Sequence, residues 1–255
     1  MLRAGRCALD RHTRIRIHLE TEFGLSEPLR TLDAGASSGE FVYLMQKLGH
    51  SARGIEPHVG YAAHANSTLG LNVTNCTFSE LPPVEEPFGL ITLFHVLEHL
   101  EFPVQDLLRL RSMLDARGIF VIEVPNILYR GMKFSHKWHK GHLNGFTVES
   151  LKATAAMAGL QAVECGEIGD GGNLFGVFRS APPISAEEAC GMLRGHADKA
   201  WAAIKANTNV DYFLRGDTWS KIPRKMFSQV AERRQAPTYM SAAAILDEVY
   251  RRINR

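Results

Sequence analysis

The hydrophobic positions in the first half of the chain alternate between short continuous runs and longer runs with helical spacing. Residues 90–96 and 119–124 are short and apolar, as buried strands are. Residues 41–48 and 104–114 instead place apolar side chains three and four positions apart, which is typical of a helix with one buried face. Strands that alternate with helices predict an α/β fold, in which helices cover both faces of a largely parallel sheet.

The same pattern extends to the other elements before residue 180. Helices are predicted over 1–30 (ending at Gly24), 41–48, 59–69, 104–114 and 147–159. Strands are predicted over 31–33, 52–55, 72–78, 90–96, 119–124, 162–168 and 174–179. The last two strands flank the turn Gly169-Asp170-Gly171-Gly172, which predicts an antiparallel pair. The expected sheet therefore has seven strands and is mostly parallel.

The composition changes after Ala181-Pro182-Pro183, where the strand pattern stops. Residues 184–255 hold two or three helical segments and no strand pattern, so we interpret them as a helical appendage and not as a second catalytic domain. The predicted organisation is an N-terminal helical segment over 1–30, a central domain over 31–180 and the appendage over 181–255. The appendage is also where we expect any oligomer interface.

Composition and charge exclude several classes of protein. No apolar run in the 255 residues is long enough to span a bilayer, and the net charge of +2 does not favour nucleic acid as a partner. The four cysteines are far apart in the sequence, which argues against a zinc ribbon or a disulfide framework. The first residues are arginine-rich, but Asp10 follows early and no apolar signal core is present, so we expect a cytoplasmic protein.

Residues 31–48 are the most informative about function, because a strand, a turn of small residues and a helix follow one another there. Gly35 and Gly39 permit positive φ angles and close approach of a ligand, and the helix start offers unpaired N–H groups to an anion. The dinucleotide fingerprint G-x-G-x-x-G is absent, because Ser37 stands where its second glycine would be. Glu56 follows the next strand, where a carboxylate can accept both hydroxyls of a ribose.

Five segments in this order resemble the class I S-adenosylmethionine-dependent methyltransferases, in particular the broad subfamily with a Leu-Glu-His-Leu signature after the fourth strand. The segments are Leu32–Gly35 with Gly39, Gly54–Pro57, Leu90–Leu100, Gly118–Asn126 and His142–Thr147. The resemblance covers about residues 30–180 and implies a Rossmann-like fold, S-adenosylmethionine as methyl donor and methyl transfer as the reaction. The family often has a third glycine in the turn, where this chain has Ser37.

The resemblance also implies which residues hold the donor. Asp33, Gly35 and Gly39 are expected around its methionine portion. Glu56 is expected at the ribose and Phe78 beside the adenine, although an aromatic side chain there is equally typical of a core. The complete predicted donor-binding set is Asp33, Gly35, Ala36, Gly39, Glu56, Pro57, Thr77, Phe78 and His95.

The segment His95-Val96-Leu97-Glu98-His99 matches on spacing the H-x-x-E-H pattern of a zinc peptidase. That pattern requires a long helix, whereas this segment begins at the end of a predicted strand, so we reject the peptidase interpretation. In the methyltransferase fold it lies at the carboxyl edge of the sheet, facing the transferable methyl group. Histidine titrates in the range useful for removing a proton, so His99 and His142 are the candidate bases, with Glu98 orienting or polarising one of them. The alternative is that Glu98 and His99 only cap the following helix.

Two further functions stay open at this stage. Some family members that methylate RNA ends or polyphenols bind a divalent ion. His95, Glu98, His99 and His142 could form such a cluster, in which a histidine at 95 favours a borderline metal over magnesium. Our primary prediction includes no metal. The other alternative is a donor-binding partner subunit that has lost catalysis, and the intact histidines argue against it.

We expect the acceptor to be an oxygen atom of a small molecule or of a sugar or glycan unit. The loop over 134–142 is aromatic and basic, which suits a negatively charged acceptor. No aromatic and basic nucleic-acid module is recognisable in the chain, which argues against RNA. The tail is also basic, at Lys221, Arg224, Lys225, Arg233, Arg234, Arg251, Arg252 and Arg255.

Overall fold

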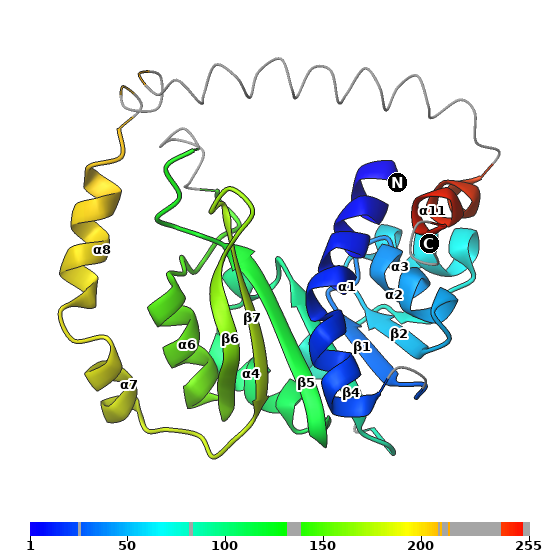
Figure 1. Cartoon of the computed structure of the whole chain (residues 1–255), viewed down its shortest axis with the longest axis horizontal. Coiled ribbons are helices and arrows are strands. Elements are labelled where there is room, and N and C mark those ends of the chain that lie inside the picture. The colour runs from blue at the N-terminus through cyan, green and yellow to red at the C-terminus, as the bar shows by residue number, and fades with distance from the viewer. Residues whose placement is uncertain are drawn as a thin grey trace. The chain divides into compact units, whose positions relative to one another are not determined.

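The computed structural model describes residues 1–24, 27–81, 84–131, 139–208 and 241–251, together with positions 210 and 214. Seven strands of this part of the chain form one sheet in the order β3-β2-β1-β4-β5-β7-β6 (Figure 1). β1 is parallel to β2 and β4, and β2 is parallel to β3. β6 and β7 are antiparallel, as the glycine-rich turn between them predicts. The predicted α/β fold with a mostly parallel, seven-stranded sheet is confirmed.

The strands are short, apart from β5 and the final hairpin. They are β1 (Arg30–Ala34), β2 (Ser51–Ile55), β3 (Val73–Thr74), β4 (Phe88–Phe94), β5 (Leu114–Pro125), β6 (Leu160–Ile168) and β7 (Asn173–Ser180).

The described residues form two compact units. The first contains Met1–Thr92, Met113–Ile119 and the C-terminal helix, and the second contains Leu93–Ser112 and the described residues from 120 to 208. β4 and β5 contribute residues to both units.

The described residues of the first unit include four α-helices, of which α2 contacts β1 and β2 and α3 contacts β3 (Figure 1). They are α1 (Leu2–Phe23), α2 (Glu40–Lys47), α3 (Val59–Leu69) and α11 (Ala242–Tyr250). α1 ends at Gly24, as predicted, and contacts α2, the helix that follows the glycine turn. α11 belongs to the sequence that we interpret as an appendage, yet it contacts α1, α2 and α3.

The core of this unit explains why its segments take these forms. Apolar side chains from three parallel strands and from α2, which is buried at every position from Glu40 to Met45, are fully buried, and burial of each such side chain stabilises the fold by roughly 1.5–3 kcal/mol. They include Leu32, Leu44, Met45, Ile55 and Leu90.

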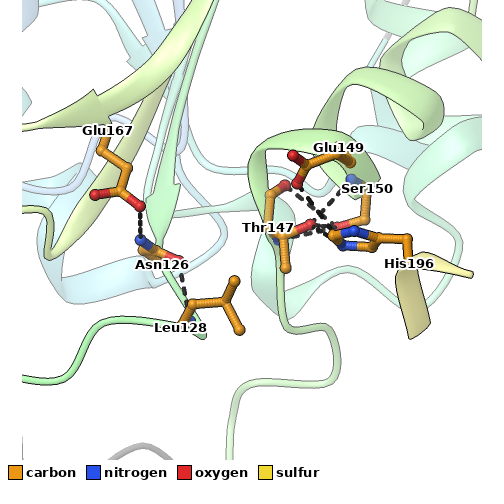
Figure 2. Close-up of polar contacts among 7 residues, drawn as sticks. All are labelled: Asn126, Leu128, Thr147, Glu149, Ser150, Glu167 and His196. Atoms are coloured by element: carbon orange, nitrogen blue, oxygen red, sulfur yellow. Dashed lines mark hydrogen bonds and ion pairs between the residues drawn. The ribbon is translucent and has the colours of Figure 1, made fainter. Parts of the chain in front are cut away.

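The helices of the second unit are η2 (Leu97–His99), α4 (Pro103–Arg111), α6 (Val148–Met157), α7 (Ala186–Met192) and α8 (His196–Lys205). α6 contacts β6, α4 and α7. It begins after Thr147, as predicted, because the Thr147 hydroxyl accepts the N–H of Ser150. Nε2 of His196 lies 2.8 Å from the same hydroxyl, so the capping residue also attaches α8 (Figure 2).

The third strand is shorter than predicted. It contains only Val73–Thr74 of the expected 72–78. Thr77 and Glu80 form a capping box after it, and this starts the 3₁₀ helix η1 (Phe78–Glu80) in place of a longer strand.

The boundary between α4 and β5 also differs from the prediction. The helix predicted to reach residue 114 ends at Arg111, and β5 begins at Leu114 instead of residue 119. The carbonyl of Met113 accepts the N–H of Phe88 at the start of β4, and this pairing favours an extended chain over another helical turn.

Within the described residues, no helix is both long and apolar enough to cross a membrane. Most of the loop 134–142 and every basic tail position except Arg251 lie outside the described residues. The division of the chain at 30 and 180 stays a prediction.

Candidate functional site

The turn between β1 and α2 is a tight loop with three residues at positive φ. Gly35, Ser37 and Gly39 have φ angles of 87°, 48° and 85°. A Cβ atom on Gly39 would lie 2.4 Å from Cδ1 of Leu71, so both space and conformation require glycine there. Serine takes the left-handed conformation at a cost of roughly 1–2 kcal/mol, which explains why related chains often have glycine at the Ser37 position.

Hydrogen bonds hold this turn against β2 and connect it to the start of α2. The N–H groups of Gly35 and Ala36 both donate to the carbonyl of Ile55, at 2.8 and 2.9 Å. The N–H of Tyr43 donates to the carbonyl of Gly39 at 2.8 Å and closes the first helical turn. The turn thus leads directly into the N-terminus of α2, and the N-terminus of a helix favours a nearby anion.

Glu56 connects the end of β2 to this turn. One carboxylate oxygen accepts the N–H of Ser37 at 2.9 Å and the other accepts the N–H of His58 at 2.8 Å. The side chain is buried, with 8% of its residue surface exposed. Each carboxylate oxygen has a second lone pair, so these bonds still leave Glu56 able to accept hydroxyl groups.

Asn75 brings two predicted donor-binding segments together, and our sequence analysis missed it. Its side-chain amide donates to the carbonyls of Glu56 and Pro57, both at 2.9 Å. Thr77 and Phe78 follow at the start of η1, where Thr77 is the capping residue and Phe78 is buried.

Asp33 is buried at the end of β1 and has an altered acidity. Its carboxylate accepts the hydroxyl of Thr92 at 2.7 Å. Burial raises the pKa of Asp33 to about 6. The Thr92 hydroxyl and the charge of Arg11 on α1 oppose this rise, whereas the charges of Glu40 and Glu56 add to it. This accumulation of acidic groups favours a ligand that brings a positive charge.

The second unit holds a separate group of histidines around Glu98. The carbonyl of Glu98 accepts the N–H groups of Leu143 and Asn144, at 2.8 and 3.0 Å. These backbone hydrogen bonds attach the segment that contains His142 to η2. Nδ1 of His99 lies 2.7 Å from the carbonyl of Gly141, and the rings of His99 and His142 meet edge to face, with centroids 4.8 Å apart.

A third histidine, His139, belongs to this group and was absent from our predicted site. Its ring centroid lies 4.9 Å from that of His142, and its Nδ1 accepts the N–H of Gly141. Burial lowers the pKa of His142. The charge of Glu98 opposes this effect, whereas the neighbouring imidazoles of His99, His139 and His95 lower the pKa further. A neutral His142 imidazole can accept a proton.

The Glu98 carboxylate is buried without a satisfying partner. Glu98 is 1% exposed, and neither carboxylate oxygen makes a hydrogen bond of good geometry to the described residues. The ring nitrogens that lie near it are Nδ1 of His95 at 3.4 Å and Nε2 of His99 at 3.9 Å. A buried carboxylate in this state is costly, which favours a functional use for it.

His95 lies between two buried carboxylates in a left-handed backbone conformation with φ of 59°. Its Nε2 is 3.2 Å from a carboxylate oxygen of Glu123, which also accepts the side-chain amide of Asn173 at 2.8 Å. Burial alone would lower the pKa of His95, but the carboxylates of Glu123 and Glu98 outweigh it and raise the pKa to about 9. The structure therefore places His95 as a cation between acids.

The structure groups the predicted site residues by unit. The first unit brings together Asp33, Gly35, Ala36, Gly39 and Glu56, with Pro57, Thr77 and Phe78 attached through Asn75. The second unit brings together His95, Glu98, His99 and His142. The Glu98, His99 and His142 ligand atoms lie within 4.8 Å of one another, a spacing that could hold a metal ion. The individual roles of these residues stay predictions.

The sequence model of a family described as a methyltransferase domain matches residues 8–165. The match begins inside α1, earlier than residue 30, where we expected the resemblance to start. No curated protein sequence matches the chain.

Several solved structures of methyltransferases share this fold. The N-methyltransferase NodS from Bradyrhizobium japonicum is 19% identical, and the match covers 68% of this chain and 96% of NodS with a TM-score of 0.52. The 1,6-didemethyltoxoflavin-N1-methyltransferase from Burkholderia thailandensis, with 1,6-didemethyltoxoflavin and S-adenosylhomocysteine bound, is 22% identical over 65% of this chain and 76% of that one, with a TM-score of 0.53. The CcbJ methyltransferase from Streptomyces caelestis is 14% identical, and the match covers 62% of this chain and 86% of CcbJ with a TM-score of 0.53. At these identities the likeness concerns the fold.

The buried Asp33 carboxylate generates a prediction about stability and pH. With a pKa of about 6 in the folded chain against 3.8 as its ordinary value, ionised Asp33 destabilises the fold above pH 6, and this penalty disappears as the pH falls toward 4. We expect Asp33→Asn to raise the free energy of unfolding at pH 8 by up to about 3 kcal/mol, with a smaller gain at pH 5. Denaturant unfolding at both pH values measures the difference.

Asp10→Asn is the matched control, since Asp10 is exposed on α1 and its substitution should change stability little at either pH. A gain at Asp33→Asn that is equal at pH 5 and pH 8 would contradict the assigned ionisation.

Proposed function

The chain belongs to the methyltransferase domain family and is an enzyme with S-adenosylmethionine as its methyl donor, and we propose that it transfers the methyl group to an oxygen atom of a small molecule or of a sugar or glycan unit. We further propose that a histidine is the general base.

The turn between β1 and α2 is the observation that supports this donor most strongly. The N–H groups of residues 40–42 suit the carboxylate of the methionine portion, and Asp33 suits its ammonium group. Gly39 lets the turn pack closely, since a Cβ there would lie 2.4 Å from Cδ1 of Leu71. Glu56 has free lone pairs for ribose hydroxyls, and we assign Pro57, Thr77 and Phe78 to the adenine side. When bound, the donor supplies a methyl group activated by its sulfonium.

The group around Glu98 suits proton removal from an acceptor. A hydroxyl must lose its proton as its oxygen attacks, and a hydroxyl needs such help more than most nucleophiles because its own pKa is high. His142 is the better candidate, because burial and the adjacent imidazoles lower its pKa and keep it neutral. Glu98 would stabilise the imidazolium that forms, either directly or through His99.

We base the proposed small size of the acceptor on a solved methyltransferase structure, and its proposed negative charge on the residues at the end of the loop. The Burkholderia thailandensis enzyme carries 1,6-didemethyltoxoflavin, a small heterocycle, and a small acceptor is the simplest assignment for this chain as well. The histidine-rich end of the loop, with exposed Lys140, suits an acceptor that carries negative charge.

Calorimetry with S-adenosylmethionine and S-adenosylhomocysteine tests the donor assignment. We expect both to bind, and we expect Asp33→Asn to weaken S-adenosylmethionine binding at least tenfold while stabilising the free protein. Because the proton on Asp33 must leave before an ammonium group can pair with it, affinity in the wild type should fall by up to about tenfold per pH unit below 6. No binding of either compound would refute the proposed function.

Substitution of the histidines tests the proposed base, with turnover followed as S-adenosylhomocysteine formed against a panel of hydroxyl acceptors. We expect His142→Gln to lower kcat by about 10²- to 10⁴-fold and leave the donor Kd unchanged, because only the proton transfer is lost. His64→Gln is the control, since His64 lies on α3 with its Nδ1 3.2 Å from the exposed Thr68 hydroxyl, outside the histidine group. Unchanged turnover in His142→Gln and in His99→Gln would exclude a histidine base. Donor binding without turnover on any acceptor would favour the non-catalytic partner subunit.

A second candidate function is metal-assisted methyl transfer, including transfer to an RNA end. The observation that favours it is the Glu98, His99 and His142 spacing together with the unsatisfied Glu98 oxygens. One carboxylate and two imidazoles suit a borderline ion such as zinc. His95 suits this role less than we expected, because its contacts with Glu98 and Glu123 favour the protonated form, which cannot bind a metal.

Metal content separates this candidate from the metal-free base. If the metal-assisted function is correct, elemental analysis finds about one ion per chain, chelation removes activity and zinc restores it, and Glu98→Gln loses the ion. Full activity in a metal-free sample that has been dialysed against chelator would exclude it.

A further inference from the structure

We infer that the C-terminal helix α11 is part of the donor site, because Tyr250 and Asp247 hold the first turn of α2 in its donor-binding position. Both act as positioning residues and neither is expected to touch the donor. The inference rests on the proposed donor assignment and goes beyond it, since it gives a role to residues about 200 positions after the glycine turn.

Tyr250 binds the backbone at the residue that follows the glycine turn. Its hydroxyl donates to the carbonyl of Glu40 at 2.9 Å in a buried position. Glu40 is the first residue of α2 and comes directly after Gly39. A contact at this carbonyl therefore restrains the first turn of α2, next to the glycine turn.

Asp247, on the same helix as Tyr250, restrains α2 through Tyr43 and Lys47. Its carboxylate accepts the hydroxyl of Tyr43 at 2.8 Å and lies 3.1 Å from Nζ of Lys47. Tyr43 is also the residue whose N–H donates to the carbonyl of Gly39. The backbone of Tyr43 thus closes the first turn of α2, while its side chain attaches that turn to α11.

α11 is itself well anchored, so it can serve as a fixed support. Leu246 is fully buried, and Val249 and Tyr250 are also buried. A Cβ atom on Gly5 of α1 would lie 2.8 Å from Cδ2 of Leu246, which shows how closely the two helices approach. The glycine turn is therefore held by Ile55 and Glu56 on the β2 side and, through α2, by α11.

Removal of a single hydroxyl group tests this inference. In Tyr250→Phe the ring that fills the space between α11 and α2 stays, and only the hydrogen bond to Glu40 is lost. We expect the Kd for S-adenosylhomocysteine to rise roughly three- to tenfold, because binding must then order the first turn of α2. Amide hydrogen exchange at Gly39 and Tyr43, whose N–H groups are hydrogen-bonded, should become faster in the free protein.

Asp247→Ala is the second variant, because it removes the contacts with both Tyr43 and Lys47 from a partly exposed position. We expect the same direction of change in Kd and in hydrogen exchange. Glu248→Gln is the matched control on the same helix, since Glu248 pairs only with exposed Arg251 among the described residues, and it should leave both measurements unchanged.

The outcomes separate this inference from the donor assignment. If the wild type binds S-adenosylhomocysteine, and both variants bind it with the wild-type Kd while only their melting temperatures fall, α11 is merely structural and the inference is wrong. If the wild type does not bind the compound at all, the donor assignment is wrong, and the proposed role of α11, which rests on it, is wrong as well. Weaker binding and faster exchange in both variants, with an unchanged control, support the inference.

Discussion

Three successive N–H groups of the glycine turn point at the end of β2, and the rest of the first unit depends on this constraint. Gly35 and Ala36 donate to the Ile55 carbonyl, and Ser37 donates to the Glu56 carboxylate. A chain that satisfies all three bonds must take positive φ twice within three residues. This geometry places the N-terminus of α2 directly after the turn, and a helix N-terminus favours an anionic ligand group.

The same constraint explains an energetic conflict at Asp33. The turn brings Glu40 and Glu56 close enough to Asp33 for their charges to raise its pKa. Burial of Asp33 is the larger cause of this rise. Folding would be more favourable with a neutral side chain there. An acid that destabilises the free protein but attracts a cationic ligand is typical of a binding site, where stability is exchanged for function.

The sequence predicted those features of the fold and site that depend on local chemistry. The seven-stranded sheet, Gly35 and Gly39 at positive φ, and Thr147 as a helix cap each follow from residues close in the chain. The early start of β5 could not be predicted in this way, because it depends on the pairing of Met113 with Phe88. The support from α11 was equally inaccessible, since a contact between Tyr250 and Glu40 leaves no periodic or motif signal in either segment.

The histidine group of the second unit has an asymmetry that its sequence pattern conceals. Among the described residues, four imidazoles gather there and Glu98 is the carboxylate in contact with both His95 and His99, whereas Glu123 contacts Nε2 of His95. Once His95 is held as a cation between these acids, it cannot accept another proton. In the proposed function, proton transfer or metal binding is then assigned to His99 and His142, with the ring of His139 next to that of His142. His95, which begins the H-x-x-E-H pattern, contacts the Glu98 carboxylate of the same pattern, so we assign it no part in proton transfer.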